Sequence, residues 1–183
     1  MSDENAAFLD AFPTWLRSLA DDAVALAGLL GAESTPVGAR RAIAGGLNYL
    51  FKSLDLVPDG IDDIGYLDDA FVLRVAARDA LAFEGAKSAD LKGALERLTA
   101  EVATIDTFLG ADAGRLHSYV KQLGKGAARG RTVDEIVDDA NTRKEFVSDV
   151  HSFAKSYQAP TFTRDEKTLV KMRSFLTARL PPA

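Results

Sequence analysis

Residues 47–59 read LNYLFKSLDLVPD and residues 65–70 read GYLDDA, and these two runs decide how the chain is interpreted. The first run is an apolar, aromatic helix that stops before a proline, because Pro58 restricts Val57 to an extended conformation. The second run opens a new helix with two carboxylates in its first turn, where negative charge favours the helix dipole. We therefore predict a helix–loop–helix unit whose loop spans Asp55 to Gly65.

The sequence on both sides of this unit also has a helical pattern. Alternating strand patterns are missing, and Val and Ile are sparse beside Ala and Leu. We predict an all-α protein, a compact multi-helix bundle of about seven or eight helices. Five helices are expected over about 13–30, 36–54, 66–83, 88–109 and 111–123. Three more are expected at capping boxes formed by Thr132 with Glu135, Thr142 with Glu145, and Thr163 with Glu166.

Two of the predicted helices carry information about packing. Gly45 and Gly46 each cost about 1 kcal/mol relative to alanine in a helix interior. A close helix crossing would offset this cost, and a kink is the alternative. Ser88 is predicted to cap a helix with a heptad-like seam of less than three heptads, which favours packing within the chain over an intermolecular coiled coil. The seam residues are Leu91, Leu95, Leu98, Val102, Ile105 and Leu109.

Length and composition limit the class of protein. A chain of 183 residues amounts to about one domain, and the absence of cysteine excludes disulfides and zinc sites that need sulfur. We expect a single helical domain over 1–183, with a helix–loop–helix core at 34–86, additional helices at 88–183 and a candidate subdomain join at 124–131. The start is acidic, and no apolar run reaches the roughly 20 residues of a membrane span. A cytoplasmic location is therefore expected, with peripheral membrane contact left open.

Six carboxylates fall within fifteen residues of the motif: Asp55, Asp59, Asp62, Asp63, Asp68 and Asp69. Oxygen-rich clusters bind hard divalent cations, although this spacing does not match an EF-hand. A metal site would use Asp55, Asp59, Asp68 and Asp69, and no other cofactor is indicated. We favour a structural role, in which Asp55 accepts loop amides while Asp68 and Asp69 stabilise the helix start or pair with Arg40, Arg41, Arg74 or Arg78.

The two quoted runs together resemble the YkvA-like family, the bacterial domain of unknown function 1232. Its pattern is an aromatic helix end, then Asp-Leu-Ile-Pro, six residues, and Gly-Tyr-Leu-Asp-Asp. The resemblance covers about residues 39–77, and Asp62 stands where the family often has a second proline. The family has no established activity, so the resemblance implies a domain without naming a function.

A basic segment follows, with Arg115, Lys121, Lys125, Arg129 and Arg131 and no acid between them. We interpret residues 124–131 as a flexible, glycine-rich linker. The alternatives are binding to phosphate, nucleic acid or an anionic membrane surface, and docking onto the acidic loop within or between chains. The segment is not a P-loop, because the Gly-Lys-Ser/Thr ending and a preceding strand are missing.

Our first functional hypothesis is a non-enzymatic helical interaction or scaffold protein that binds an unknown protein partner or itself. One alternative is a metal-dependent enzyme, or a metal-binding protein, that uses Mg²⁺, Ca²⁺ or Mn²⁺ at Asp55–Asp69. Another is a peripheral membrane or nucleic-acid adaptor that uses residues 115–131. The sequence has no nucleophile or dinucleotide motif, and we interpret His117 and His151 as helix-surface residues.

Overall fold

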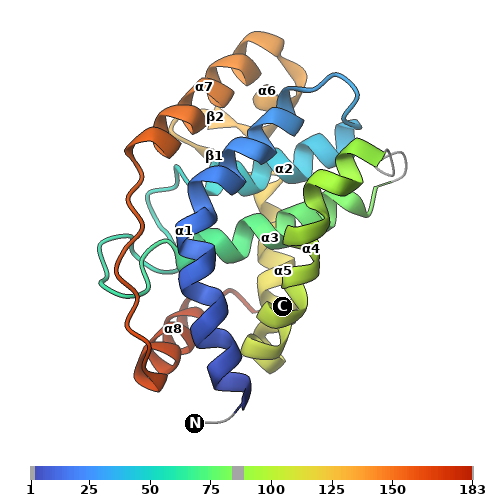
Figure 1. Cartoon of the computed structure of the whole chain (residues 1–183). Helices are drawn as coiled ribbons and strands as arrows, with labels where there is room; N and C mark the ends of the chain where they lie inside the picture. Colours follow the sequence, from blue (N-terminus) through green and yellow to red (C-terminus); the bar gives the residue numbers. More distant parts are fainter. Residues whose placement is uncertain (1–2, 84–88, 183) are drawn as a thin grey trace.

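The computed structural model describes residues 3–83 and 89–182 (Figure 1). The expected all-α bundle of about seven or eight helices is confirmed. The α-helices are α1 (Asp3–Gly31), α2 (Val37–Tyr49), α3 (Leu67–Leu81), α4 (Ala89–Leu109), α5 (Ala113–Leu123), α6 (Val133–Asp138), α7 (Ala140–Ser156) and α8 (Glu166–Arg179). A 3-10 turn, η1 (Gly110–Asp112), precedes α5, and a hairpin of β1 (Ala127–Ala128) and β2 (Arg131–Thr132) precedes α6.

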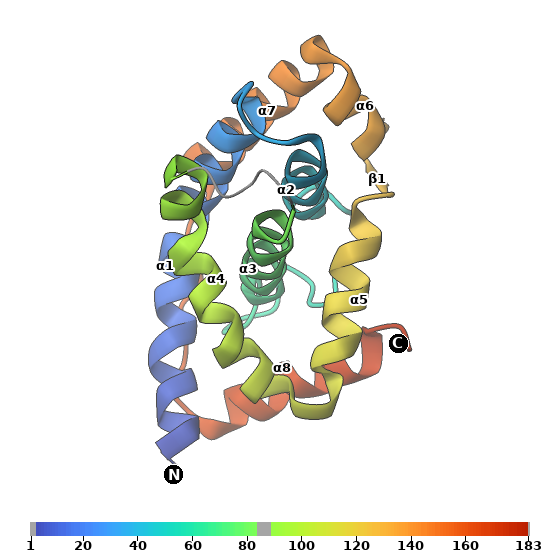
Figure 2. The ribbon, with the colours of Figure 1, turned by 90° about the vertical axis from the view of Figure 1, so that its right-hand side faces the viewer.

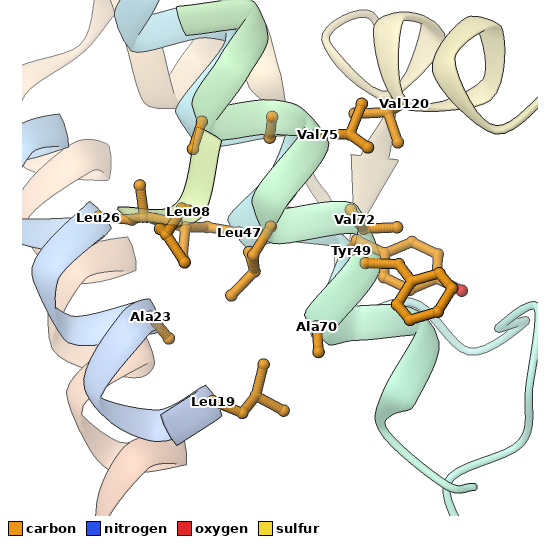
Figure 3. Packing of buried hydrophobic residues seen from close by; sticks show 14 of the residues in the cluster. Leu19, Ala23, Leu26, Leu47, Tyr49, Ala70, Val72, Val75, Leu98 and Val120 are labelled. Atoms are coloured by element: carbon orange, nitrogen blue, oxygen red, sulfur yellow. The ribbon is translucent and has the colours of Figure 1, made fainter. Parts of the chain in front are cut away.

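Helix α3 forms the centre of the molecule, with α1, α2, α4 and α5 packed around it (Figure 2). Every residue from Leu67 to Ala77 is buried, so this helix has no solvent-facing side over its first three turns. Figure 3 shows Leu19, Ala23 and Leu26 projecting from α1 toward the centre, while Val75 and Val120 meet on another side of α3. The loop and helix of the quoted motif therefore supply the core against which the other helices pack.

A fully buried arginine lies in this central helix. The Arg74 side chain is 0% exposed, and its guanidinium carbon lies 4.3 Å from the centre of the Trp15 ring. Its Nε donates to Glu101 at 2.7 Å, and its Nη2 lies 3.5 Å from the buried Asp22 carboxylate. Since breaking a buried ion pair by removing one partner costs about 3–5 kcal/mol, this group fixes α1, α3 and α4 relative to one another.

Several predicted helix boundaries were wrong. Helix α1 begins ten residues before Pro13, because Phe8, Leu9 and Phe12 are buried and their packing outweighs the hydrogen bond that an interior proline removes. Helix α2 ends at Tyr49 rather than near Leu54.

The helix caps were predicted in part. The capping box of Thr132 and Glu135 is confirmed. The other two boxes were wrong, because an aspartate nearer to each helix start takes the cap: Asp139 accepts from the Thr142 amide, and Asp165 accepts from the Lys167 amide. The predicted cap at Ser88 lies outside the described residues. The predicted linker at 124–131 overlaps the hairpin, which sequence patterning missed because each strand has only two residues.

The two packing predictions are confirmed. A Cβ on Gly46 would lie 2.5 Å from the Ala76 Cβ of α3, and one on Gly45 would lie 2.8 Å from the Gly124 amide nitrogen. This is a close helix crossing rather than a kink. The seam of α4 is buried inside the chain along its whole length, as expected for packing in its own bundle. Among the described residues, none of the helices combines the length and apolar character needed to cross a membrane.

The crossing predicts opposite effects for two Gly-to-Ala substitutions. Gly46→Ala should destabilise the fold by about 1–3 kcal/mol, because the new methyl group has no space against Ala76. Gly28→Ala in α1 is the matched control, since nothing lies within 4 Å of its Cβ position, and it should stabilise the fold by up to about 1 kcal/mol. Urea unfolding of both variants measures the difference; equal stabilities would contradict the crossing.

Candidate functional site at the acidic loop

A chain of buried hydrogen bonds attaches the loop to the two helices that it joins. The Tyr49 hydroxyl, at the end of α2, donates to Asp68 Oδ2 at 2.5 Å and accepts the Leu56 amide at 2.7 Å. The same Asp68 oxygen accepts the Val57 amide at 2.9 Å. Two consecutive amides that precede Pro58 are therefore satisfied by side chains from both helices, which lets this apolar stretch of loop enter the core.

The return of the loop into α3 depends on close backbone contact. The Gly65 amide donates to the Ile61 carbonyl at 2.9 Å, and a Cβ on Gly65 would overlap the Asp59 carbonyl oxygen. Tyr66 then takes a left-handed conformation with φ of 64° and serves as the N-cap residue of α3. The tight turn places Asp68 and Asp69 in the first helical turn, as the sequence predicts.

The C-terminal segment also contacts the loop. Thr163 Oγ1 donates to Asp63 at 2.5 Å, and Lys171 Nζ donates to the Asp62 carbonyl at 3.0 Å. Arg179 Nη1 donates to the Asp55 carbonyl at 3.1 Å. The outer side of the loop is therefore held by α8 and by the residues just before it. Both follow the motif by about a hundred residues in the chain.

Our prediction that Asp55 accepts the loop amides was wrong, because Asp68 and Tyr49 take that role. Asp55 is half-buried, and its backbone carbonyl rather than its side chain makes the contact to α8. The predicted arginine partners of Asp68 and Asp69 were also wrong. Arg74 pairs with Asp22 and Glu101, Arg78 pairs with Asp79, and Arg41 pairs with Asp134. Arg40 donates to the Ala32 carbonyl.

The loop carboxyls have raised pKa values because they are removed from water. Burial raises the pKa of Asp68 to about 7, against the hydrogen bonds from Tyr49 and Val57 that lower it. Burial and the charge of Asp68 raise the pKa of Asp69 well above its usual range. Burial and the charge of Asp59 raise the pKa of Asp55 to about 6. Asp68 Oδ1 and Asp69 Oδ2 are buried with no hydrogen-bond partner in the described chain, so a neutral carboxyl is favoured there.

The four predicted metal ligands differ in burial, although the charges of Asp59 and Asp55 both act on the buried Asp69. Asp68 and Asp69 lie inside the core at 0% and 2% exposure, whereas Asp55 and Asp59 lie nearer to the surface. Over residues 3–83 and 89–182, no three carboxylate or imidazole side chains are grouped so that they could hold a metal ion. The arrangement found in the motif is a hydrogen-bonded core.

A polar cleft lies beside the loop, where it meets the hairpin and α7. Its volume is about 340 Å³, and its polar lining residues are Asp59, Tyr66, Arg129, Asp149, Ser152 and Ser156. The guanidinium of Arg129 stacks 4.9 Å from the centre of the Phe51 ring. The cleft thus brings Asp59 and Arg129, one residue from each predicted charged group, to the same site.

Of the other predicted basic residues, Arg131 reaches the cleft through its lining residue Asp149, whereas Arg115, Lys121 and Lys125 lie elsewhere. Arg115 is bound to Asp112 and to carbonyls at the end of α8, including that of Pro181. Arg131 pairs with Asp149 at 2.5 Å. Lys121 and Lys125 are exposed near the end of α5 and line a different pocket. The five predicted basic residues are therefore distributed over several places in the described structure, and anion binding by them stays a prediction.

The comparison with known families matches the motif. Residues 39–74 match the family described as "Protein of unknown function (DUF1232)". The expected resemblance is confirmed over these residues, which include most of α2, the loop and the first half of α3. No curated protein and no solved structure matches the chain.

Sequence reasoning missed the roles of three side chains, two of them within the DUF1232 segment. The motif predicts Tyr49 only as part of an aromatic helix end, yet its hydroxyl makes the central hydrogen bonds. Arg74 was treated as a partner for the motif aspartates; its position among apolar residues at helical spacing was the available signal that it is buried. His117 lies on α5 with its side chain 23% exposed, as a helix-surface residue, and it also contacts Asp106 and Arg78 at 2.6 Å each.

We expect Asp68 to act on stability through its acceptor oxygen. Asp68→Ala leaves the Val57 amide and the Tyr49 hydroxyl without their acceptor, at a cost of about 2 kcal/mol or more. Asp68→Asn keeps an acceptor oxygen and should cost less. Neither cost should change on adding EDTA or Mg²⁺. Thermal melts measure this, and a wild type that loses stability in EDTA while the variants do not would favour the metal hypothesis.

The raised pKa of Asp68 predicts how stability depends on pH. A carboxyl whose pKa is higher in the folded than in the unfolded state binds more protons when folded. Its contribution is therefore fully present below about pH 4 and is lost as pH rises toward about 7. The stability of wild type relative to Asp68→Asn should decrease between pH 5 and pH 8 in urea unfolding. The exposed Asp21→Asn serves as the control variant, and a constant difference between wild type and Asp68→Asn would contradict the prediction.

Proposed function

We propose that this chain is a non-enzymatic helical interaction protein in which the DUF1232 segment is the internal frame. The supporting observation is that Asp68 Oδ2 is fully occupied inside the protein by the Tyr49 hydroxyl and the Val57 amide. A carboxylate that acts on a substrate must reach the reacting group within hydrogen-bond distance. Asp68 and Asp69, at 0% and 2% exposure, face the core instead.

The polar cleft is the surface that this frame offers to a partner. It is lined by the frame through Asp59 and Tyr66, and by α7 through Asp149, Ser152 and Ser156. Its volume of about 340 Å³ suits one or two anchoring side chains of a protein partner, since binding energy concentrates where a few side chains fill pockets. The metal-dependent and the membrane or nucleic-acid alternatives stay predictions.

The test fills the cleft without disturbing the frame. Ser152→Tyr places a large side chain in the cleft from an exposed position on α7, and Lys144→Tyr makes the same change elsewhere on α7. Both variants should melt like wild type, because neither position is part of the core. A protein captured by wild type and by Lys144→Tyr, but lost with Ser152→Tyr, is then purified and titrated by calorimetry.

We expect Ser152→Tyr to weaken that binding at least tenfold, which corresponds to about 1.4 kcal/mol. If the partner binds both tyrosine variants with equal affinity, the cleft is not its binding site. Turnover of any small substrate that is abolished by Asp55→Asn or Asp59→Asn, with folding retained, would overturn the non-enzymatic function itself.

A further inference from the structure

A second pocket lies between α2, α3 and α5, away from the acidic loop. Its volume is about 320 Å³, and its walls are mostly apolar: Gly38, Ala42, Ala76, Phe83 and Val120. The Phe83 ring lies so close to Gly38 that a Cβ there would overlap it, and the phenylalanine remains 44% exposed. The proposed function does not use this pocket.

The rim of the pocket is cationic. Arg41, Lys121 and Lys125 line it, with Asp79 as the only acid among its lining residues. The Asp79 carboxylate is already paired with Arg78 at 2.8 Å, and Arg41 is paired with Asp134. Lys121 and Lys125 are exposed and form no ion pair within the described part of the chain. Two ammonium groups are therefore available at the mouth of an apolar cavity.

We propose that this pocket binds a short-chain anionic amphiphile, with the apolar chain between Ala42, Ala76 and Val120 and a carboxylate at Lys121 and Lys125. Ligand pockets range over about 300–1,000 Å³, so the volume fits a small ligand. Burial of the chain contributes about 0.8 kcal/mol per methylene group. Charge-assisted hydrogen bonds from the lysines select an anionic head over a neutral one.

The composition of the pocket separates this ligand from a simple anion. An inorganic phosphate would contact the lysines but would leave the apolar walls exposed to water. It would therefore gain no binding free energy from the burial of apolar surface. A neutral chain of equal length would fill the walls without pairing with the lysines. The inference therefore requires both parts of the ligand to contribute.

Calorimetric titration with octanoate tests the proposal, with 1-octanol, octyltrimethylammonium and inorganic phosphate as comparison ligands. We expect octanoate to bind in a one-to-one complex, and each comparison ligand to bind at least tenfold more weakly. Replacing both Lys121 and Lys125 by alanine should weaken octanoate binding about tenfold or more. Lys144→Ala on α7 is the control and should bind as wild type does. These exposed substitutions should leave the melting temperature unchanged.

Three results would overturn the proposal. Octanoate that gives no heat at millimolar concentration excludes the ligand class, even if the protein sediments with anionic vesicles. If the double lysine variant binds octanoate as tightly as wild type does, the charged rim plays no part in binding. Equal binding of phosphate or 1-octanol shows that only one half of the ligand is recognised. None of these results bears on the polar cleft, so this proposal fails separately from the proposed function.

Discussion

The fold depends on the pair of hydrogen bonds that Tyr49 and Asp68 make with the amides of Leu56 and Val57. Those amides follow a helix and precede Pro58, so they have no regular secondary structure to satisfy them. Because a buried amide without a partner costs about 1–3 kcal/mol, the apolar loop can pack into the core only with these acceptors present. Helix α3 is then brought against α2 at the Gly46–Ala76 crossing, and the remaining helices pack around it.

The central helix places two kinds of buried ionisable side chain within two turns. Asp68 and Asp69 lie near its start, where burial raises their pKa values and favours the neutral acid. Arg74 lies one to two turns later and remains charged, because Asp22 and Glu101 pair with it and Trp15 stacks on it. The buried carboxyls make the stability of the fold sensitive to pH, whereas the buried arginine fixes the positions of neighbouring helices. Both require that the helix be covered on all sides.

The sequence predicted what depends on short-range patterns. The helical class, the close crossing at Gly45–Gly46 and the capping box of Thr132 and Glu135 are local in origin, and all are confirmed. The predicted start of α1 was wrong because burial of Phe8 and Phe12 is a tertiary effect. It outweighs the local preference of Pro13 for the first turn of a helix. The acceptor of the loop amides could not be assigned from the sequence, because Asp55 and Asp68 are the same type of residue and only the return of the chain at Gly65 decides between them. The polar cleft combines residues more than ninety positions apart, and no linear pattern could show it.

The hydrogen bonds around Tyr49 join residues only 7 to 19 positions apart in the chain. The entropy of loop closure grows with the length of chain enclosed, so these contacts form at a small entropic cost. The contacts from Thr163 and from α8 to the same loop instead enclose 100 residues or more. The order of assembly follows from this difference: α2, the loop and α3 can close as a unit, and the C-terminal helix can only dock onto a loop that already has its shape.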